Sequence, residues 1–574
     1  MVGVMRAHRM ALLCLLAAPI GLLGAVAARA LVTLIDLLTN MFLFHRVSLD
    51  VPDMASLQPG WWLLPVAMLG GLLVSVIARW VPIIRGHGIP EAMEAVVQRQ
   101  SRMAPAAAVA KPISGAIAIG TGAPFGAEGP IVVTGSAIGS LIGQLIPVSP
   151  AERRVLLACG AAAGTAGIFG TPLAAMLLPL ELLLFEFSTR SIAPLLIAAA
   201  VATAARTLFL HGHPFMPPLS FATPTGSDLV LFALLGLVCG LAAVGICKGL
   251  FLIESGYRRL PIPAFWHPVI GGMGFALVGL AQPRILGVGY GVIAAELTGS
   301  IAGGALLALG LAKLLAWWVA LGSGTSGGTL APLLFIGGAF GGSVAWVANL
   351  AGMHVDPRAF ALVAMAAVFG AATRAVLTGI AFMWELAAAP SMTIPLMLAT
   401  GIAALVATSL ASDSLMTEKL TRRGLRIHHH AEVDVLRQTP VSAVMTRDVV
   451  TLAPTMSVAE ARGVVAMAGH GAFPIVTEGR MIGIVSRTDL LADDIDDARP
   501  VVEAGRRDVV TVSGSASVLD VLDTIVREEV EHVPVVDDGR LVGICTRTDV
   551  LRARAEQLAD ERVPPRRGTD PDPR

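Results

Sequence analysis

The sequence predicts an all-α polytopic membrane domain followed by a smaller soluble α/β domain. Of its 574 residues, 55% are hydrophobic and 14% are charged, and the mean hydropathy is +0.75, a composition typical of integral membrane proteins. Apolar segments follow one another from Met10 to Leu410, and several approach the ~20 residues that span a bilayer. The formal net charge is zero, which argues against nucleic acid as a partner.

The first apolar segment predicts a retained membrane helix and not a cleaved signal. Arg6 and Arg9 precede it, and Ala28 to Ala30 resembles a cleavage site, but apolar character continues from Leu31 to Phe44. A signal peptide would end before this second stretch. The leading basic residues are expected to place the N-terminus in the cytoplasm.

One carboxyl group interrupts the apolar region. Glu128 lies in the sequence Gly126 to Pro130, between the apolar segments Ile113 to Ile119 and Ile131 to Ile146. A carboxylate at membrane depth is costly and usually marks an ion or proton pathway. The flanking glycines break the helix, and Pro130 suits the first turn of a new one. Glu128 is therefore predicted to act as a gate or proton carrier beside a helix N-terminus.

The membrane region contains an internal repeat. Pro172 to Glu181 resembles Val376 to Glu385, and each segment follows a Phe-Gly pair. Gly126 to Pro130 likewise has a counterpart in Gly327 to Pro332, at a similar offset. Two halves with interrupted helices at matching positions predict a transporter-like repeat, with the binding site where the halves meet.

The chain after the last apolar segment reads as two copies of one soluble unit. Gly479 to Leu491 matches Gly539 to Leu551, and strands are expected at 472–476 and 532–536, each followed by a glycine turn. The histidines 428–430 fit a solvated linker better than a metal site. The predicted boundaries are a membrane domain over 1–423, a linker over 424–438, soluble units over 439–497 and 498–556, and a disordered tail over 557–574.

Three glycine-rich motifs resemble, in their order, those of the CLC family of chloride channels and proton-coupled chloride exchangers. They are Gly86 to Pro90, Gly126 to Pro130 and Gly328 to Pro332, and residues 361–386 resemble the family's late helices. The two soluble units resemble a tandem CBS pair. The resemblance covers nearly the whole chain. It implies a membrane domain of two inverted repeats with broken helices, in a homodimer with one anion path per subunit.

By this resemblance, glycine-rich backbone at helix N-termini would hold the anion, because free N–H groups and the helix dipole favour negative charge there. The backbone of Gly88, Ile89, Thr329 and Leu330 would bind the central ion. Glu128 would compete with that ion until the carboxyl is protonated or moves aside. The predicted anion-site residues are His87, Gly88, Ile89, Pro90, Gly126, Gly129, Thr329, Leu330 and Met416.

Two of these positions depart from the family pattern. His87 stands where serine is common, and Met416 stands where the family has its central tyrosine. A histidine can offer an N–H donor and becomes cationic at mildly acidic pH. We therefore expect His87 either to touch the anion and add pH sensitivity or to turn aside and bond to backbone. Met416 removes a hydroxyl donor, so fluoride or nitrate is the alternative to chloride.

Other departures bear on proton coupling. Leu182 stands where exchangers of the family often have an inner glutamate, and leucine carries no proton. Glu186 offers another route, while Glu181 is expected to contact a helix end. Ala127 replaces a common basic residue, whose charge Lys111 could supply in part. These features favour channel-like or weakly coupled conduction, with a proton-coupled anion exchanger as the alternative.

The resemblance to CBS pairs implies an adenine-nucleotide sensor. The alternative is a pair that only packs and stiffens the dimer. A carboxylate can accept hydrogen bonds from both ribose hydroxyls, and Arg487 or Arg547 could meet phosphate. The glycine cluster Gly287 to Gly291 also looks like a phosphate loop, but it is expected to be a membrane-surface loop. The predicted nucleotide contacts are Ser486, Thr488, Asp489, Thr546, Thr548 and Asp549.

These features predict passive or proton-coupled movement of chloride-like anions by a multi-pass protein of the cell (inner) membrane, with the CBS pair in the cytoplasm. No covalent chemistry, required cofactor or metal is expected, and the expected partners are a second copy, membrane lipid and small anions. A CBS-regulated divalent-cation transporter would need clustered acidic residues in the membrane, whereas those present are scattered. A membrane receptor that senses through its CBS pair would show no anion flux in liposomes.

Overall fold

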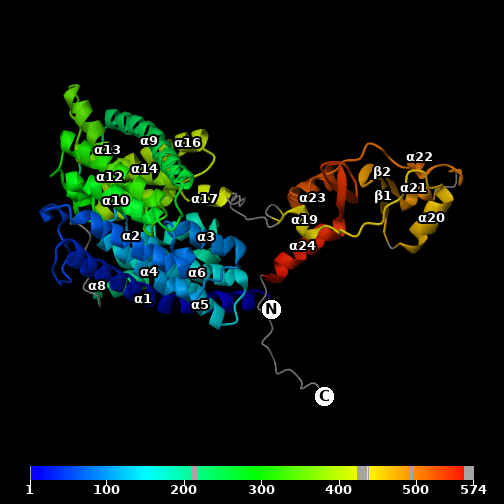
Figure 1. Ribbon diagram of the computed structural model, residues 1–574, viewed down its shortest axis with the longest axis horizontal. Helices are drawn as coiled ribbons and strands as arrows, with labels where there is room; N and C mark the ends of the chain where they lie inside the picture. Colours follow the sequence, from blue (N-terminus) through cyan, green and yellow to red (C-terminus); the bar gives the residue numbers. More distant parts are fainter. Residues whose placement is uncertain are drawn as a thin grey trace, which may run out of the picture. The chain divides into compact units, whose positions relative to one another are not determined.

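The computed structural model describes residues 2–208, 218–422, 436, 439–468, 470–491 and 495–560. Contacts divide the chain into two compact units, with the boundary between Ala431 and Glu432. Over its described residues the first unit is helical, and the second combines helices with a four-stranded sheet (Figure 1). The predicted all-α membrane domain and α/β domain are confirmed. The three adjacent histidines of the expected linker lie outside the described residues.

The described residues of the first unit contain two successive sets of eight helices, and the helices follow the same order in both sets. The first set is α1 (Val2–Leu43), α2 (Leu63–Trp80), α3 (Ile89–Gln98), α4 (Pro105–Gly120), α5 (Glu128–Leu145), α6 (Pro150–Phe169), α7 (Pro172–Pro179) and α8 (Thr189–Leu208). The second set is α9 (Gly226–Arg259), α10 (His267–Ala281), α11 (Tyr290–Thr298), α12 (Gly303–Gly322), α13 (Leu330–Leu350), α14 (Pro357–Thr373), α15 (Val376–Ala387) and α16 (Thr393–Leu410).

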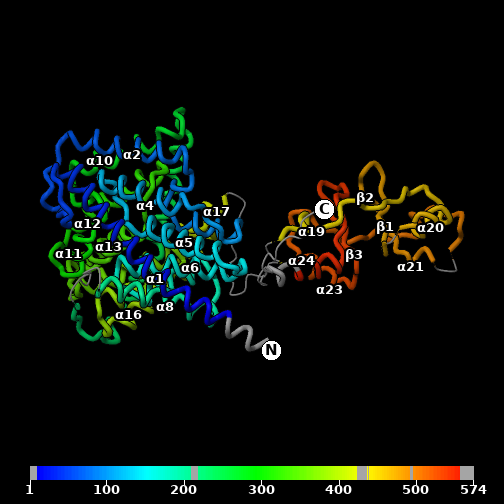
Figure 2. The backbone as a smooth tube through the Cα atoms, turned by 90° about the horizontal axis from the view of Figure 1, so that it is seen from below, coloured from blue at the N-terminus to red at the C-terminus, as the bar shows by residue number. Residues whose placement is uncertain are grey.

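Equivalent helices of the two sets pack in equivalent ways. Helix α5 packs against α6 as α13 packs against α14, and α7 lies against α15. Helices α1 and α8 lie side by side at one edge of the unit (Figure 2). The internal repeat, inferred from two pairs of segments, thus extends over the whole unit. Shorter elements are Met54–Ser56, Pro82–Ile84, Leu180–Leu184, Pro283–Ile285, Pro390–Met392 and α17 (Glu418–Thr421).

Seven of the described helices are long and apolar enough to cross a membrane. Several other apolar helices, including α7 and α15, are shorter, as the predicted interruptions require. Glycines let the helices approach closely. A Cβ on Gly135 of α5 or on Gly160 of α6 would overlap with the backbone carbonyl of the other residue. Small residues at helix crossings are typical of membrane helix packing, where backbones come into contact.

Each half supplies a carboxylate to a helix start in the other half. Glu181 accepts hydrogen bonds from the amides of Leu377 and Thr378, at 2.9 and 2.8 Å, at the start of α15. Glu385 does the same for two amides at the start of α7, at 2.9 Å each. Both carboxylates satisfy amides without an intrahelical acceptor and lie at the positive end of a helix dipole. The expectation that Glu181 contacts a helix end is confirmed.

We expect Glu385→Ala to destabilise the protein by about 1–3 kcal/mol, because two amides at the start of α7 lose their acceptor. Glu385→Gln keeps one acceptor oxygen and should cost less. The measurement is the midpoint of thermal unfolding in detergent for the wild type and both variants. Equal midpoints for the alanine variant and the wild type would contradict this role.

The second unit contains two matching halves around one sheet. The strand order is β1-β2-β4-β3 with antiparallel neighbours. Each half has its own apolar core, one around Phe473 and Val485 and the other around Val533 and Cys545. The strands are β1 (Ala472–Thr477), β2 (Arg480–Ser486), β3 (His532–Asp537) and β4 (Arg540–Thr546). Both strands expected from the sequence are confirmed, each one residue longer.

Helices flank these strands in both halves. They are α19 (Val441–Val444), α20 (Val458–Met467), α21 (Arg487–Leu490), α22 (Val501–Ala504), α23 (Val518–Arg527) and α24 (Arg547–Asp560). Helix α24 continues to Asp560, so it includes the first residues of the expected tail. The remainder of that tail lies outside the described residues.

Candidate functional site

The three glycine-rich motifs meet at one point, each at the start of a helix. Gly126 and Gly328 exchange backbone hydrogen bonds of 3.2 and 3.0 Å, and the amide of Gly327 donates to the carbonyl of Gly86 at 3.4 Å. The motifs precede α3, α5 and α13. Two motifs come from the first half of the repeat and one from the second. The helix N-termini therefore converge where the halves meet, as the repeat predicts.

This junction has no room for side chains at two of its glycines. A Cβ on Gly129 would overlap with the carbonyl oxygen of His87 and lie 2.8 Å from that of Gly327. Gly88 adopts φ +95°, a conformation that favours glycine, and a Cβ there would overlap with the Gly129 carbonyl. Backbone, not side chains, therefore forms the junction.

Glu128 lies at this junction in the first turn of α5 and is fully buried. Its Oε1 atom accepts a hydrogen bond of 3.0 Å from the hydroxyl of Tyr290. Its Oε2 atom has no side-chain partner among the described residues, and the carboxyl group also interacts with the backbone of Ala331 in the first turn of α13. That oxygen lies over the backbone of Gly126 and Gly328, where a Cβ on either glycine would meet it. The carboxyl group thus occupies the point where helix N-termini from both halves meet.

Tyr290 was not anticipated as a site residue. It lies within the glycine cluster Gly287 to Gly291 and begins α11, and its ring packs edge-on against Phe169 with ring centres 5.9 Å apart. The cluster brings Tyr290 to the buried Glu128, and its expected place at the membrane surface stays a prediction. The signal was available in the sequence: the cluster repeats the Gly-x-Gly of Gly86 to Gly88 at the equivalent place in the second half.

Two fully buried lysines hold the loops that precede α3 and α11. The Lys111 ammonium donates to the carbonyls of Ile84 and Gly86 at 2.7 Å each. Lys313 does the same for two carbonyls of the matching loop, at 2.9 Å each. Lys111 therefore clamps the loop that carries the first motif, and the expectation that it supplies part of the basic charge missing at Ala127 stays a prediction.

The predicted role of Gly88 needs correction. Its amide donates to the Glu91 carboxylate at 2.8 Å, and Lys419 of α17 forms an ion pair with the same carboxylate at 3.1 Å. An amide with a charged acceptor is not free to bind an anion. The amides of Ile89, Thr329 and Leu330 begin α3 and α13, where backbone donors have no intrahelical acceptor. The predicted residues Pro90, Gly126, Gly129, Thr329 and Leu330 are all buried at or beside the junction.

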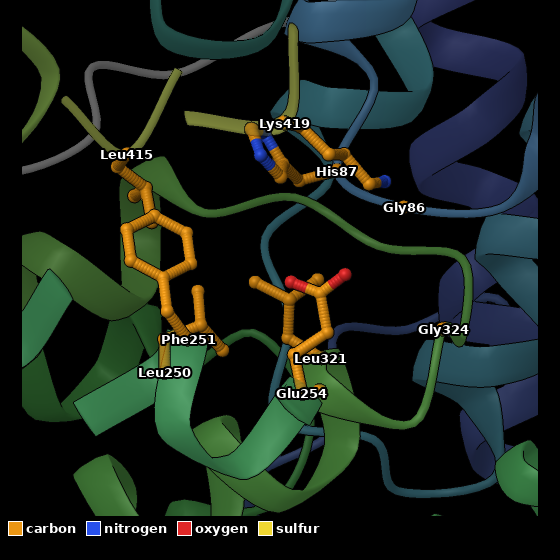
Figure 3. A pocket seen from close by; sticks show the side chains of 10 residues that line it. Gly86, His87, Leu250, Phe251, Glu254, Leu321, Gly324, Leu415 and Lys419 are labelled. Carbon is orange, nitrogen blue, oxygen red and sulfur yellow. The ribbon is translucent and has the colours of Figure 1, made fainter. Parts of the chain in front are cut away.

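Figure 3 shows a pocket that reaches the first motif, with His87 and Lys419 near each other and the carboxylate of Glu254 pointing toward them. His87 is 5% exposed, and its Nδ1 atom has no hydrogen-bond partner in the described chain. Its ring also interacts with the backbone of Leu415. The backbone contact agrees with the second alternative for His87, and the contact with an anion that adds pH sensitivity stays a prediction.

Met416, which stands at the place of the family's central tyrosine, lies next to a residue that lines this pocket. Met416 is fully buried, and its neighbour Leu415, not Met416, belongs to the pocket lining. The lining residues are Gly86, His87, Leu250, Phe251, Glu254, Leu321, Gly322, Gly324, Leu415 and Lys419.

In the second unit the predicted nucleotide residues cap helices. Asp489 accepts from the amide of Ser486 at 3.0 Å at the start of α21, and Asp549 accepts from the amide and hydroxyl of Thr546 at the start of α24. The predicted role of both carboxylates as ribose acceptors is therefore replaced in part by a capping role, since one oxygen of each is already bonded. Thr488 and Thr548 are exposed at the first turns of these helices.

A helical repeat whose broken ends meet at a buried carboxyl defines an integral membrane transport protein, and comparisons with known proteins specify the family. Residues 70–408 match the family model described as voltage gated chloride channel, and residues 441–495 and 501–556 match that of the CBS domain. The chain belongs to the voltage gated chloride channel (CLC) family of anion transport proteins, and it carries a CBS pair.

Individual relatives agree with this assignment. The chain is 30% identical over 392 residues to the H(+)/Cl(-) exchange transporter ClcA of Yersinia pestis, covering 65% of this chain and 80% of the relative. A slow cyanobacterial Cl-/H+ antiporter has a similar fold, with TM-score 0.63, 23% identity and coverage of 72% and 97% of the two chains. A eukaryotic CLC transporter matches with TM-score 0.63 and 17% identity over 95% of this chain and 98% of its own.

Proposed function

We propose that this protein exchanges chloride or a similar small anion for protons across a membrane, with Glu128 as both gate and proton carrier. One observation carries the proposal: the Glu128 carboxyl is fully buried where helix N-termini from both halves meet, with one oxygen bonded to Tyr290 and the other over the backbone of Gly126 and Gly328. Ionised, the carboxylate would occupy the field that attracts an anion. When protonated, the carboxyl group would be neutral and would no longer compete with an anion for this position.

Proton coupling is favoured over the channel-like conduction expected from Leu182. The ClcA relative from Yersinia pestis is an H(+)/Cl(-) exchange transporter, which supports exchange. Leu182 is 1% exposed and carries no proton, so it still favours uncoupled conduction as the second candidate. Glu186, the alternative inner route, accepts hydrogen bonds from the hydroxyls of Ser188 and Ser191 near the start of α8, which suits a local structural contact better than a proton carrier.

The finer features of the proposal follow from the same residues. The amides of Ile89, Thr329 and Leu330, with His87, would contact the anion, and Met416 would narrow the path. Because the side chains of His87 and Met416 alter the site, fluoride and nitrate are the anions that compete with chloride in this proposal. We further propose a homodimer in the cell (inner) membrane, with N-terminus and CBS pair in the cytoplasm and an adenine nucleotide as the CBS ligand.

Purified protein in liposomes tests the proposal. With a chloride gradient and no other driving force, we expect chloride efflux together with proton uptake in a fixed ratio. Chloride efflux without proton movement would favour the uncoupled alternative. The absence of any anion flux, with fluoride and nitrate tried in turn, would refute anion transport.

A further inference from the structure

A second buried carboxyl group lies in the membrane domain, away from the three motifs. Glu296 of α11 is 2% exposed, and neither of its carboxyl oxygens has a hydrogen-bond partner among the described residues. Its Oε2 atom and the methyl group of Met365 lie over Gly338 of α13, where a Cβ would overlap with both. An ionised carboxylate is costly in such surroundings, so Glu296 must be neutral or must face an opposing charge.

Lys313 supplies an opposing charge to two carboxyl groups at once. Its ammonium is fully buried and interacts electrostatically with both Glu128 and Glu296. The two carbonyls that it clamps keep it in place at 2.9 Å each. It also lies 5.2 Å from the ring centre of Phe335. Because both acids interact with the same cation, the charge of one acid affects the charge of the other.

Among the described residues, few other charged groups lie near Glu128, Lys313 and Glu296. Lys313 is the only charged residue in the sequence of α12, and the sequence of α13 has none. On α11 itself, Tyr290 bonds to Glu128 and also interacts with Asp36 of α1. From α14, Arg358 reaches the end of α11 but is paired with Asp356 at 2.9 Å. The balance of charge is therefore set mainly by Glu128, Lys313 and Glu296.

We propose that Glu296 is a second proton-binding group, which shares one proton with Glu128 across Lys313. With one carboxyl protonated, the two acids and the ammonium are together neutral. An anion that arrives at the motifs adds negative charge, and uptake of a second proton from water cancels it. Anion binding and proton binding then favour each other. This inference rests on the proposed exchange function and provides a proton site that does not require a carboxyl at position 182.

The first test is Glu296→Gln in liposomes, with chloride and proton fluxes recorded together over a range of pH. We expect the ratio of protons to chloride to fall at least about fivefold, the lower end of a typical coupling between sites, and the pH dependence of chloride flux to flatten. Glu385→Gln is the matched control, because it removes a membrane-domain carboxyl assigned to a helix cap, and its flux ratio should equal the wild-type value. A wild-type ratio and pH profile in Glu296→Gln would overturn the proposal.

A second measurement keeps the proposal testable if Glu296→Gln fails to insert or if the wild type moves no protons. Infrared difference spectra between acidic and alkaline pH report the carbonyl stretch of protonated carboxyl groups in purified protein. We expect a titrating carboxyl band in the wild type and in Glu296→Asp, and its loss or shift in Glu296→Gln. A wild type without proton flux would refute the exchange function, whereas identical spectra for all three proteins would refute proton binding at Glu296.

Discussion

Glu128→Gln is expected to retain chloride flux while reducing proton flux by about 100-fold or more, the usual scale for loss of a positioned proton-transfer group. The amide of glutamine is neutral, so it imitates the protonated acid and no longer competes with an anion, but it carries no proton. Glu128→Ala removes the side chain from the junction altogether and should pass chloride at least as fast as the glutamine variant. The measurement is paired recording of chloride efflux and proton uptake in liposomes.

Glu186→Gln is the control for this experiment. Its carboxyl accepts hydrogen bonds from Ser188 and Ser191, so the variant should keep both fluxes close to wild type. Loss of proton flux in Glu186→Gln, with wild-type behaviour in Glu128→Gln, would transfer the proton role to the other carboxyl. Unchanged fluxes in both Glu128 variants would remove this residue from the gate.

Gly129→Ala is expected to abolish transport and to destabilise the membrane domain by about 3 kcal/mol or more, because the new methyl group must displace backbone. The carbonyl of His87 overlaps with the Cβ position, and the Cα of Gly328 lies 2.8 Å from it. These atoms belong to the other two motifs, so the variant forces apart the helix starts that surround Glu128. The measurements are liposome flux and the thermal midpoint in detergent.

Gly401→Ala is the matched control. This glycine lies within α16, and nothing lies within 4 Å of a Cβ added to it. Alanine should raise stability slightly there, because it favours the helix, and flux should stay at the wild-type level. If Gly129→Ala also transported at the wild-type rate with an unchanged midpoint, the close junction of the three motifs would not be needed for function.

The hydrogen bonds that changed the predicted roles of Gly88 and of the CBS carboxylates could have been predicted from the sequence. Glu91 stands three residues after Gly88, which is the spacing of a capping box. The sequence therefore already indicated that this carboxylate accepts a hydrogen bond from the Gly88 amide. The same holds for Ser486 and Asp489 in the CBS pair. In each case the local hydrogen bond within one turn takes precedence over a ligand that the family resemblance suggested.

Other features depend on residues far apart in the chain. Tyr290 and Glu128 are separated by 162 positions, and Lys419 meets Glu91 across 328 positions. A tyrosine after a glycine loop, or a lysine in an apolar helix, has no local signal that names its partner. The reciprocal caps of Glu181 and Glu385 show the same limit, because the internal repeat indicated equivalent positions without indicating that each acid crosses to the other half.

The sequence by itself determined the membrane class, the two repeats, the CBS pair and the place of Glu128 between broken helices. These follow from hydropathy, from glycine and proline as helix breakers, and from acid at membrane depth, all of which act over a few residues. The tertiary structure alone decided which side chains surround that acid. Burial makes the cost of each charge depend on neighbours from other helices. The roles of Tyr290, Lys313 and Glu296 therefore depend on how α5, α11 and α12 each pack against α13.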